Sequence, residues 1–262
     1  MERPLRSGCA GMKVAILAGG QGSRLAEETR VKSKAMVGIG ERPILWHLLK
    51  YYEHHGYHEF VIALGHHADS IRQYFVETLR SDAVGDGARL VVRPKAEPGW
   101  TVELIDTGLA TMSGGRIKRL APYLDGPFML TWCDGLADVD LARLCAFHQG
   151  HGRLATLTAV HPPARFGRLA LAGARVSAFR EKTVDPDEWI NGAFFVLEPG
   201  VFEHIAGDDT EFERAPLSGL AAAGELMAHR HDGFWQCMDT LKEAQDLNAL
   251  WRRGAAPWKV WA

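Results

Sequence analysis

The stretch VAILAGGQGSRL, residues 14–25, decides the fold class of this 262-residue chain. Its first five residues are all apolar, which is typical of a strand buried on both faces of a sheet. Three glycines and an arginine follow at Gly19, Gly20, Gly22 and Arg24. Backbone N–H groups of such a loop can approach a phosphate because no Cβ interferes, and the arginine can bind the phosphate with its planar fork. The stretch therefore predicts a central strand that ends in a phosphate-binding loop.

Two familiar glycine-rich motifs do not fit this loop. The dinucleotide motif GxGxxG would need glycine at Leu25, and the P-loop would need GK[ST] at residues 22–24. A tight strand-to-helix turn without a ligand stays an alternative for a glycine cluster taken alone. Lys32 and Lys34 lie about ten residues further on and would supply positive charge to a polyanionic substrate, although alone they could be a solvated surface pair.

Strand-like and helix-like patterns alternate along the first 150 residues. This alternation predicts an α/β fold with a mostly parallel sheet. We expect strands at 60–64 and 128–132, and helices at 44–52, 68–79 and 141–147. Beyond about residue 150 we expect shorter strands at 155–160, 168–171, 176–179, 193–197 and 226–230, and a closing helix at 240–251.

The domain organisation follows from the same pass along the chain. Residues 1–11 are polar and contain glycine, so we expect a flexible N-terminal extension. No internal repeat, low-complexity tract or long linker interrupts residues 12–262. We therefore expect a single domain in which a nucleotide-binding half, about 12–150, precedes a substrate-binding half, about 151–262.

Charge and hydropathy exclude several classes of partner. The 30 Lys and Arg residues and 32 Asp and Glu residues are mixed along the chain, and the net charge is −2. Without a basic block, neither a nucleic-acid track nor a membrane-surface helix is indicated. Residues 1–11 lack the apolar run of a signal peptide, and no stretch approaches the roughly 20 apolar residues of a membrane span. We expect a soluble cytoplasmic protein.

Several further motifs carry a resemblance to a known family. The loop GGQGSRL is followed by VKSKAMV at 31–37 and RPILWH at 42–47. Their order resembles the signature of the sugar-phosphate nucleotidyltransferases, whose common form is GGxGTRL, PKPM and KPIL. Seven further motifs resemble those of the glucose-1-phosphate cytidylyltransferases within that family. They are VELIDTG at 102–108, MSGGRIKR at 112–119, CDGLAD at 133–138, RFG at 165–167, EK at 181–182, INGAFFV at 190–196 and GFWQCMDT at 233–240.

The resemblance runs from about Met12 to the C-terminus and implies both fold and activity. It implies a Rossmann-like, mostly parallel mixed sheet flanked by helices, the GT-A-like nucleotidyltransferase fold. The implied reaction is a Mg2+-dependent condensation of CTP with a sugar 1-phosphate, glucose 1-phosphate or a related acceptor, to a CDP-sugar and pyrophosphate. It also implies a homo-oligomer.

The resemblance assigns roles position by position. The implied catalytic residues are Arg24 and Lys34 on the triphosphate, Asp134 and Asp239 as the Mg2+ ligands, and Lys182 on the acceptor phosphate. The implied nucleotide-binding residues are Leu17, Ala18, Gly19, Gly20, Gly22, Ser23, Arg24, Lys34, Thr107, Met112 and Gly114. The implied acceptor-binding residues are Trp132, Glu181, Lys182 and Asn191.

The chemistry agrees with those residue types. Transfer of a nucleotide to a phosphate oxygen needs no protein nucleophile, and the obstacle is repulsion between two anions, so charge neutralisation and alignment should dominate catalysis. Two carboxylates suit Mg2+, which prefers oxygen ligands. Asp134 follows a predicted strand at the edge where α/β sheets bind ligands. Asp239 has the alternative role of capping the helix that begins near Thr240.

Departures from the family pattern leave the acceptor open. Cys133 stands where the pattern has glycine, Trp132 replaces tyrosine, and Thr183 and Ala193 replace proline and glycine. Another sugar phosphate, or a small phosphate or phosphonate, is therefore an alternative acceptor. A non-catalytic nucleotide-sugar sensor is a second hypothesis, which the complete set of metal and phosphate residues argues against. A dinucleotide-dependent oxidoreductase is weaker still, because the third glycine is missing.

Overall fold

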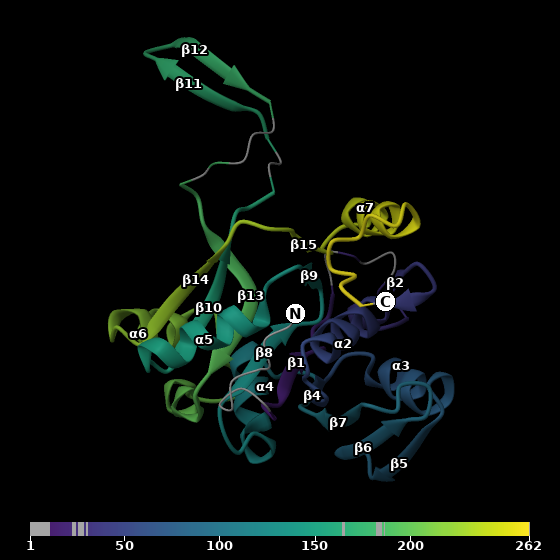
Figure 1. Cartoon of the computed structure of the whole chain (residues 1–262). Coiled ribbons are helices and arrows are strands. Elements are labelled where there is room, and N and C mark those ends of the chain that lie inside the picture. Colours follow the sequence, from purple (N-terminus) through teal and green to yellow (C-terminus); the bar gives the residue numbers. More distant parts are fainter. Residues whose placement is uncertain are drawn as a thin grey trace.

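A central mixed sheet runs through the molecule (Figure 1). The computed structural model describes residues 11–22, 25, 29, 31–163, 166–181, 185 and 187–261. In this part of the chain the sheet has nine strands, in the order β14 (Leu226–His231), β10 (Ala155–Val160), β13 (Ile190–Leu197), β8 (Phe128–Trp132), β1 (Val14–Leu17), β4 (Glu59–Leu64), β7 (Thr101–Asp106), β6 (Arg89–Pro94) and β5 (Ser81–Gly85).

β1 lies at the centre of this sheet, as the apolar run predicts. It pairs in parallel with β4 on one side and with β8 on the other, and its described residues are buried. β7 continues the parallel set beyond β4. Only β13 and β6 run against the direction of the other seven strands, as their antiparallel pairings show. The expected mostly parallel mixed sheet is confirmed.

Helices cover both faces of the sheet. Alternate β1 residues point to opposite faces, and all of them are apolar, so each face must be covered. Val14 and Ile16 belong to one core cluster, together with residues of α2 (Ile44–His54), α3 (Ala68–Gln73), α5 (Leu141–His151) and α7 (Leu241–Arg252). Ala15 and Leu17 belong to the other, with α4 (Ser113–Leu120) and α6 (Ala215–Ala222). Each face of the strand therefore has its own apolar layer.

Shorter elements complete the fold. The 3-10 segments are η2 (Lys34–Met36), η4 (Ala121–Tyr123) and η5 (Pro199–His204), and a π-helical turn, η3 (Tyr74–Thr78), continues α3. β2 (Gly38–Ile39) pairs with β3 (Arg42–Pro43), and β9 (Gly135–Ala137) pairs with β15 (Trp235–Cys237). None of the described helices has the length and apolar character needed to cross a membrane.

A two-stranded hairpin projects from the body of the molecule (Figure 1). It consists of β11 (Arg168–Ala172) and β12 (Arg175–Arg180), which pair with each other and form a separate sheet. Both strands are expected from the sequence. Their apolar side chains are not in the core, since Leu169, Leu171 and Phe179 are 55%, 63% and 62% exposed.

Several elements are not anticipated by the pattern, among them β5, β6, β7, α4 and α6. β5 and β6 form a hairpin at the edge of the sheet. The β5 sequence SDAVG has few apolar residues, which fits a strand that is mostly exposed. α4 contains Gly114 and Gly115, which disfavour a helix by propensity. A Cβ at Gly115 would lie 2.5 Å from the Asp208 carbonyl oxygen, so close packing explains the glycine. Tertiary contact overrides local propensity there.

A buried histidine secures the C-terminal segment against α2. His47 is fully buried, and its Nε2 lies 2.9 Å from the Ile39 carbonyl oxygen. Trp258 Nε1 donates to His47 Nδ1 across 3.4 Å. Since one ring nitrogen faces an acceptor and the other faces a donor, the imidazole is neutral. Burial, together with the nearby Arg42 charge, lowers the pKa of His47 to about 4.

We expect His47 to make the fold acid-sensitive. Its folded-state pKa lies below the unfolded value of about 6.5, so its stabilisation is complete above that value and is lost as pH falls toward 4. Between pH 7 and pH 5 the loss should be about 2 kcal/mol. Urea unfolding of His47→Gln should show a pH dependence smaller by that amount, whereas exposed His58→Gln should match wild type. An unchanged pH dependence in His47→Gln would contradict this assignment.

Candidate active site

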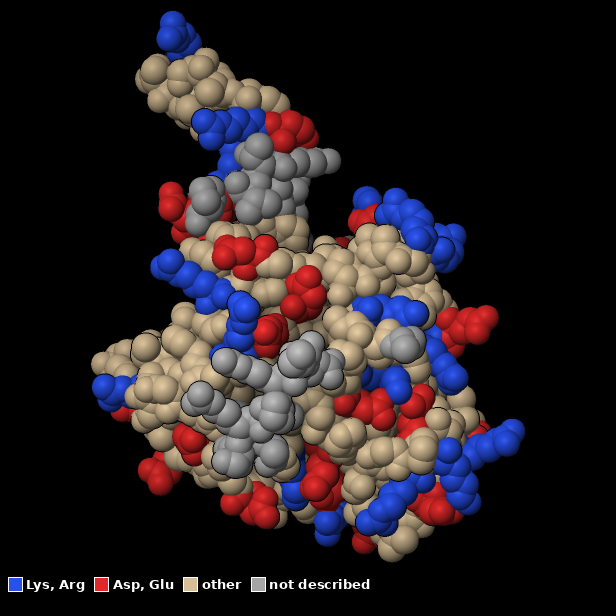
Figure 2. Space-filling model, viewed as in Figure 1, with Lys and Arg blue, Asp and Glu red and all other residues tan. Residues whose placement is uncertain are grey.

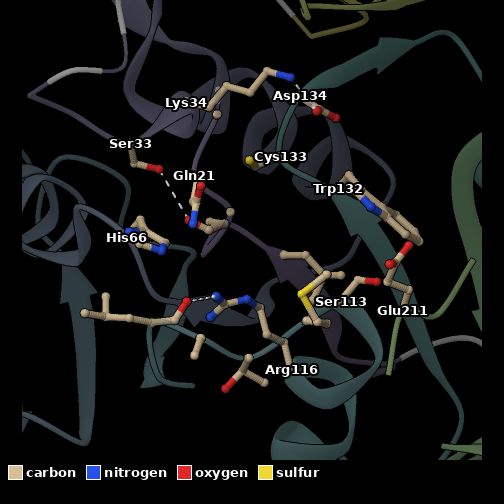
Figure 3. A pocket seen from close by; sticks show the side chains of 18 of the residues that line it. Gln21, Ser33, Lys34, His66, Ser113, Arg116, Trp132, Cys133, Asp134 and Glu211 are labelled. Carbon is tan, nitrogen blue, oxygen red and sulfur yellow. Dashed lines mark hydrogen bonds and ion pairs between the residues drawn. The ribbon is translucent and has the colours of Figure 1, made fainter. Parts of the chain in front are cut away.

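A cavity of about 660 Å³ opens at the carboxyl edge of the parallel strands (Figure 3). It lies where the chain leaves β1 and β8, which are paired so that Leu17 is opposite Trp132. The lining comes from the glycine-rich loop, η2, the start of α4, the end of β8 and the segment before α6. The lining residues are Leu17, Ala18, Gly20, Gln21, Gly22, Ser33, Lys34, His66, Leu109, Ala110, Thr111, Met112, Ser113, Arg116, Trp132, Cys133, Asp134, Glu211 and Glu213.

The glycine-rich loop packs on a buried arginine, Arg116, to which the resemblance assigns no role. Arg116 is 4% exposed, and its Nη1 donates to the Thr107 hydroxyl at 2.6 Å and to the Gly108 carbonyl at 2.8 Å. A Cβ at Gly19 would lie 2.4 Å from the same nitrogen. Gly19 therefore lets the β1 loop close over the guanidinium. Burial, together with the nearby Arg119 charge, lowers the pKa of Arg116 from its very high ordinary value, and the guanidinium stays charged.

Lys34 enters the cavity from a short, well-anchored 3-10 segment. Ser33 caps η2, since its hydroxyl accepts from Ala35 N and donates to the Ala18 carbonyl, both at 3.3 Å. Ala35 is fully buried. The family pattern has prolines at positions 33 and 35. Here the serine cap and the buried alanine hold the Lys34 backbone against the end of β1.

Two aspartates 105 positions apart meet through a small strand pair. β9 begins directly after Asp134, and β15 ends two residues before Asp239. The pairing places Cys237 opposite Gly135, and Met238 N donates to the Asp134 carbonyl at 2.7 Å. The helix-cap alternative for Asp239 fails, because Thr240 caps α7 in a capping box with Glu243. The Asp239 carboxylate instead turns toward the cavity residues.

The Lys34 ammonium bridges the two aspartates. Its Nζ donates to Asp134 Oδ2 at 2.7 Å and to Asp239 Oδ1 at 2.6 Å, and Figure 3 shows the lysine side chain directed at Asp134. Burial alone would lower the pKa of Lys34. The attraction of and hydrogen bonds to Asp134 and Asp239 outweigh it and raise the pKa above its ordinary value. The three groups form one partly buried charge cluster.

This cluster has the chemistry of a Mg2+ site. The lysine nitrogen acts as a stand-in cation and shows that both carboxylates can reach one positive centre. Among the described residues no group of three or more His, Cys, Asp or Glu side chains could hold a metal. Mg2+ is commonly bound by one or two carboxylates together with water and substrate phosphates. Asp134 and Asp239 fit that pattern.

The opposite side of the cavity is built on Trp132. Its ring packs against Phe195 at a centroid distance of 5.2 Å, and its Nε1 donates to Glu213 Oε1 at 3.1 Å. The other Glu213 oxygen accepts from the Ser113 hydroxyl at 2.5 Å. Glu213 therefore joins the end of β8 to the first residue of α4. The tryptophan that departs from the family pattern is held in a fixed orientation.

The other departures also have visible consequences. Cys133 is buried at the cavity wall, and burial with the neighbouring Asp134 charge raises the pKa of its thiol to about 12. The thiol is protonated at neutral pH, so a cysteine nucleophile is not expected. Ala193 has φ 60°, a left-handed conformation that favours glycine, and its N–H donates to Asn191 Oδ1 at 2.8 Å. The family glycine would suit this backbone better.

The residues implied by the resemblance fall into three groups. Leu17, Ala18, Gly20, Gly22, Lys34, Met112, Trp132 and Asp134 line the cavity, and Asp239 joins them through Lys34. Gly19, Thr107, Gly114, Glu181 and Asn191 do not line it; Gly19 and Thr107 contact Arg116, and Gly114 N donates to the Thr210 carbonyl. Ser23, Arg24, Lys182 and Thr183 lie outside the described residues.

Sequence reasoning missed several lining residues. Arg116 lies inside the quoted motif MSGGRIKR, so its charge beside two glycines was the available signal. His66, Glu211 and Glu213 stand in no motif that we could interpret. Glu211 and Glu213 reach the cavity because the segment before α6 packs on the start of α4, where Met112 N donates to the Asp208 carbonyl at 2.8 Å. His66 reaches it from the end of β4, where its N–H donates to the Gly19 carbonyl at 3.1 Å.

Comparisons with known proteins agree with the expected family. The family model described as nucleotidyl transferase matches residues 13–243. The chain is 48% identical over 256 residues to the glucose-1-phosphate cytidylyltransferase of Salmonella typhimurium, covering 95% of this chain and all of that protein. A mannose-1-phosphate guanyltransferase of Aspergillus fumigatus is 27% identical over 233 residues, covering 86% of this chain and 60% of that protein.

The fold recurs in solved structures of low sequence identity. UDP-glucose pyrophosphorylase in complex with UDP-glucose superposes with a TM-score of 0.69 at 14% identity, covering 93% of this chain and 99% of that chain. This likeness confirms the expected nucleotidyltransferase fold.

We expect Gly19→Ala to destabilise the protein through Arg116. The new methyl group would overlap the guanidinium, which its hydrogen bonds hold in place, and overpacking of this kind costs about 1–3 kcal/mol. The melting temperature should fall by several degrees, since about 1 kcal/mol corresponds to about 2–4 °C at this size. Gly20→Ala is the matched control, because a Cβ there meets nothing within 4 Å. Equal melting temperatures for the two variants would refute the close-packing argument.

Proposed function

The chain belongs to the nucleotidyl transferase family, and from this we propose that it condenses CTP with a sugar 1-phosphate to form a CDP-sugar and pyrophosphate. The Salmonella enzyme is 48% identical over nearly the full length of this chain, and this similarity supports CTP and a glucose 1-phosphate-like acceptor as the substrates. The cavity supports the reaction type, because it combines a glycine-rich phosphate loop with a paired carboxylate site.

We propose that residues 12–262 act as one nucleotidyltransferase domain with the triphosphate bound along the β1 loop. Backbone groups of residues 17–22 and the side chains of Arg24 and Lys34 would hold its oxygens, with Ser23 in the same loop. Thr107, Met112 and Gly114 mark the side on which the base would lie. Arg116 adds a buried positive charge beneath this loop, which favours an anion above it.

Asp134 and Asp239 would hold Mg2+ in this proposal. The bound ion would neutralise phosphate charge and align the acceptor oxygen with the α-phosphorus. The protein itself contributes positioning. The β9–β15 pair holds the Asp134 and Asp239 backbones close together. The anchored η2 segment holds the backbone from which the Lys34 side chain extends.

The acceptor would bind on the Trp132 side of the cavity. Trp132 supplies an apolar wall with a fixed ring orientation. The proposed partners for its hydroxyl and phosphate groups are Glu181, which directly follows β12, Asn191 at the start of β13, and Lys182. A small phosphate or phosphonate stays the alternative acceptor, because Cys133 and Ala193 alter this side relative to the family pattern.

We also propose that the protein is a homo-oligomer that uses the β11–β12 hairpin. The exposed apolar side chains of Phe166, Leu169, Leu171, Val176 and Phe179 gather on this arm, while charges of both signs are interspersed over the body (Figure 2). A contiguous exposed apolar surface of this kind marks an interaction site. The cytoplasmic location stays a prediction.

The direct test is pyrophosphate release with Mg2+ across four nucleoside triphosphates and a panel of sugar 1-phosphates and small phosphonates. We expect turnover with CTP and glucose 1-phosphate or a related acceptor. Asp134→Asn and Asp239→Asn should each lose on the order of 100-fold or more in kcat while keeping the wild-type melting profile. CTP binding without turnover on any acceptor would favour the nucleotide-sugar sensor, and full activity of both variants would eliminate the metal assignment.

The hairpin proposal predicts a change of size in solution. Leu169→Ser with Phe179→Ser should convert an oligomer into a particle near 28.9 kDa, measured by light scattering after gel filtration. Val84→Ser is the matched control, because Val84 is 70% exposed but lies on the edge strand β5. A wild-type monomer, or an oligomer that the hairpin variant leaves intact, would disprove this role.

A further inference from the structure

The Lys34 ammonium stands where a metal ion would have to bind. Its nitrogen is 2.7 Å from Asp134 Oδ2 and 2.6 Å from Asp239 Oδ1. The three side chains are 10%, 23% and 14% exposed, so water screens the cluster only in part. Mg2+ approaches carboxylate oxygens to about 2.1 Å. An ion that shared these oxygens would lie beside the ammonium, where two positive charges repel each other.

Two demands on Lys34 also conflict. As a counterion, it keeps two carboxylates of like charge close together. As a triphosphate ligand, it must turn its ammonium toward phosphate oxygens in the adjoining cavity, which it lines, and so away from the two carboxylates. The backbone of Lys34 is held by the Ser33 cap and the buried Ala35, so only the flexible side chain can move between the two positions.

We propose that Lys34 is an internal cation that blocks the metal site of the nucleotide-free enzyme and leaves the site when a triphosphate binds. This inference rests on the proposed function, because it takes Asp134 and Asp239 as metal ligands. The triphosphate offers Lys34 new acceptors, and the departing ammonium exposes the two carboxylates to the divalent ion. Thermodynamic linkage then makes nucleotide and metal each strengthen the binding of the other.

The consequence is a loading order for the site. A divalent ion binds weakly to the empty enzyme, so the carboxylates do not take up a metal in the absence of substrate. When the nucleotide binds, a divalent ion replaces the ammonium between the carboxylates. The two positive charges of the ion then balance the two negative charges of Asp134 and Asp239. Lys34 is thus a positioning residue for the metal as well as a ligand of the triphosphate.

The test measures Mn2+ binding to the full chain without nucleotide, by electron paramagnetic resonance of free Mn2+. Lys34→Met should bind one Mn2+ at least about tenfold more tightly than wild type, because the competing charge is gone. Lys242→Met is the matched control, since it removes the same charge from an exposed lysine that pairs with Asp246 and stands three positions after Asp239 in the sequence. It should keep the wild-type affinity.

Three further results complete the design. Adding Asp134→Asn to Lys34→Met should abolish the gain, which would locate the ion between the aspartates. If Lys34→Met unfolds without metal, recovery of the wild-type melting temperature in Mn2+ would support the proposal, and Lys34→Gln repeats the binding test in a variant that keeps a hydrogen-bond donor. Mn2+ affinity equal to wild type in both variants would overturn the inference. The readout needs no turnover, so failure of the proposed reaction with any acceptor would be seen separately.

Discussion

The parallel pairing of β1 with β4 and β8 is the constraint on which the rest of the molecule depends. Parallel neighbours bring their carboxyl ends to one edge, so the loops that follow Leu17, Leu64 and Trp132 meet there. His66 N donates to the Gly19 carbonyl, and Cys133 N donates to the Leu17 carbonyl, which tie these loops together. The cavity exists because the central strands stop at the same level.

Electrostatics at this edge are balanced by two buried cations with different partners. Arg116 donates to neutral carbonyl and hydroxyl oxygens, so it retains a charge that can act on a bound anion. Lys34 is paired with two carboxylates and has no such surplus. In the proposed mechanism, a polyanionic substrate would therefore meet one fixed positive charge and one that must first exchange partners. Burial makes both arrangements strong, because water screens them little.

The second half of the chain contributes strands to the sheet and a hairpin that lies outside it. β10, β13 and β14 extend the same sheet beyond β8 and pack against α5 and α6; β10 and β13 bury most of their apolar residues, whereas those of the edge strand β14 are at most half-buried. In the part of the chain that the structure describes, no second layer covers the β11–β12 hairpin, so its alternating apolar residues stay exposed. The pattern predicts these two strands correctly but does not reveal that they leave the body of the protein.

The amino-acid sequence by itself determined the class of the sheet, the place of β1 and the family, because a continuous apolar run, a glycine-rich loop and ordered motifs are local features of the chain. It also marked Lys34, Asp134 and Asp239 as a set. Only the tertiary structure decided how they meet: the β9–β15 pair joins residues 105 positions apart, and the Lys34 side chain occupies the space between the carboxylates. Glu213 and Arg116 entered the site in the same way. Such contacts depend on the packing of distant segments, which no local pattern encodes.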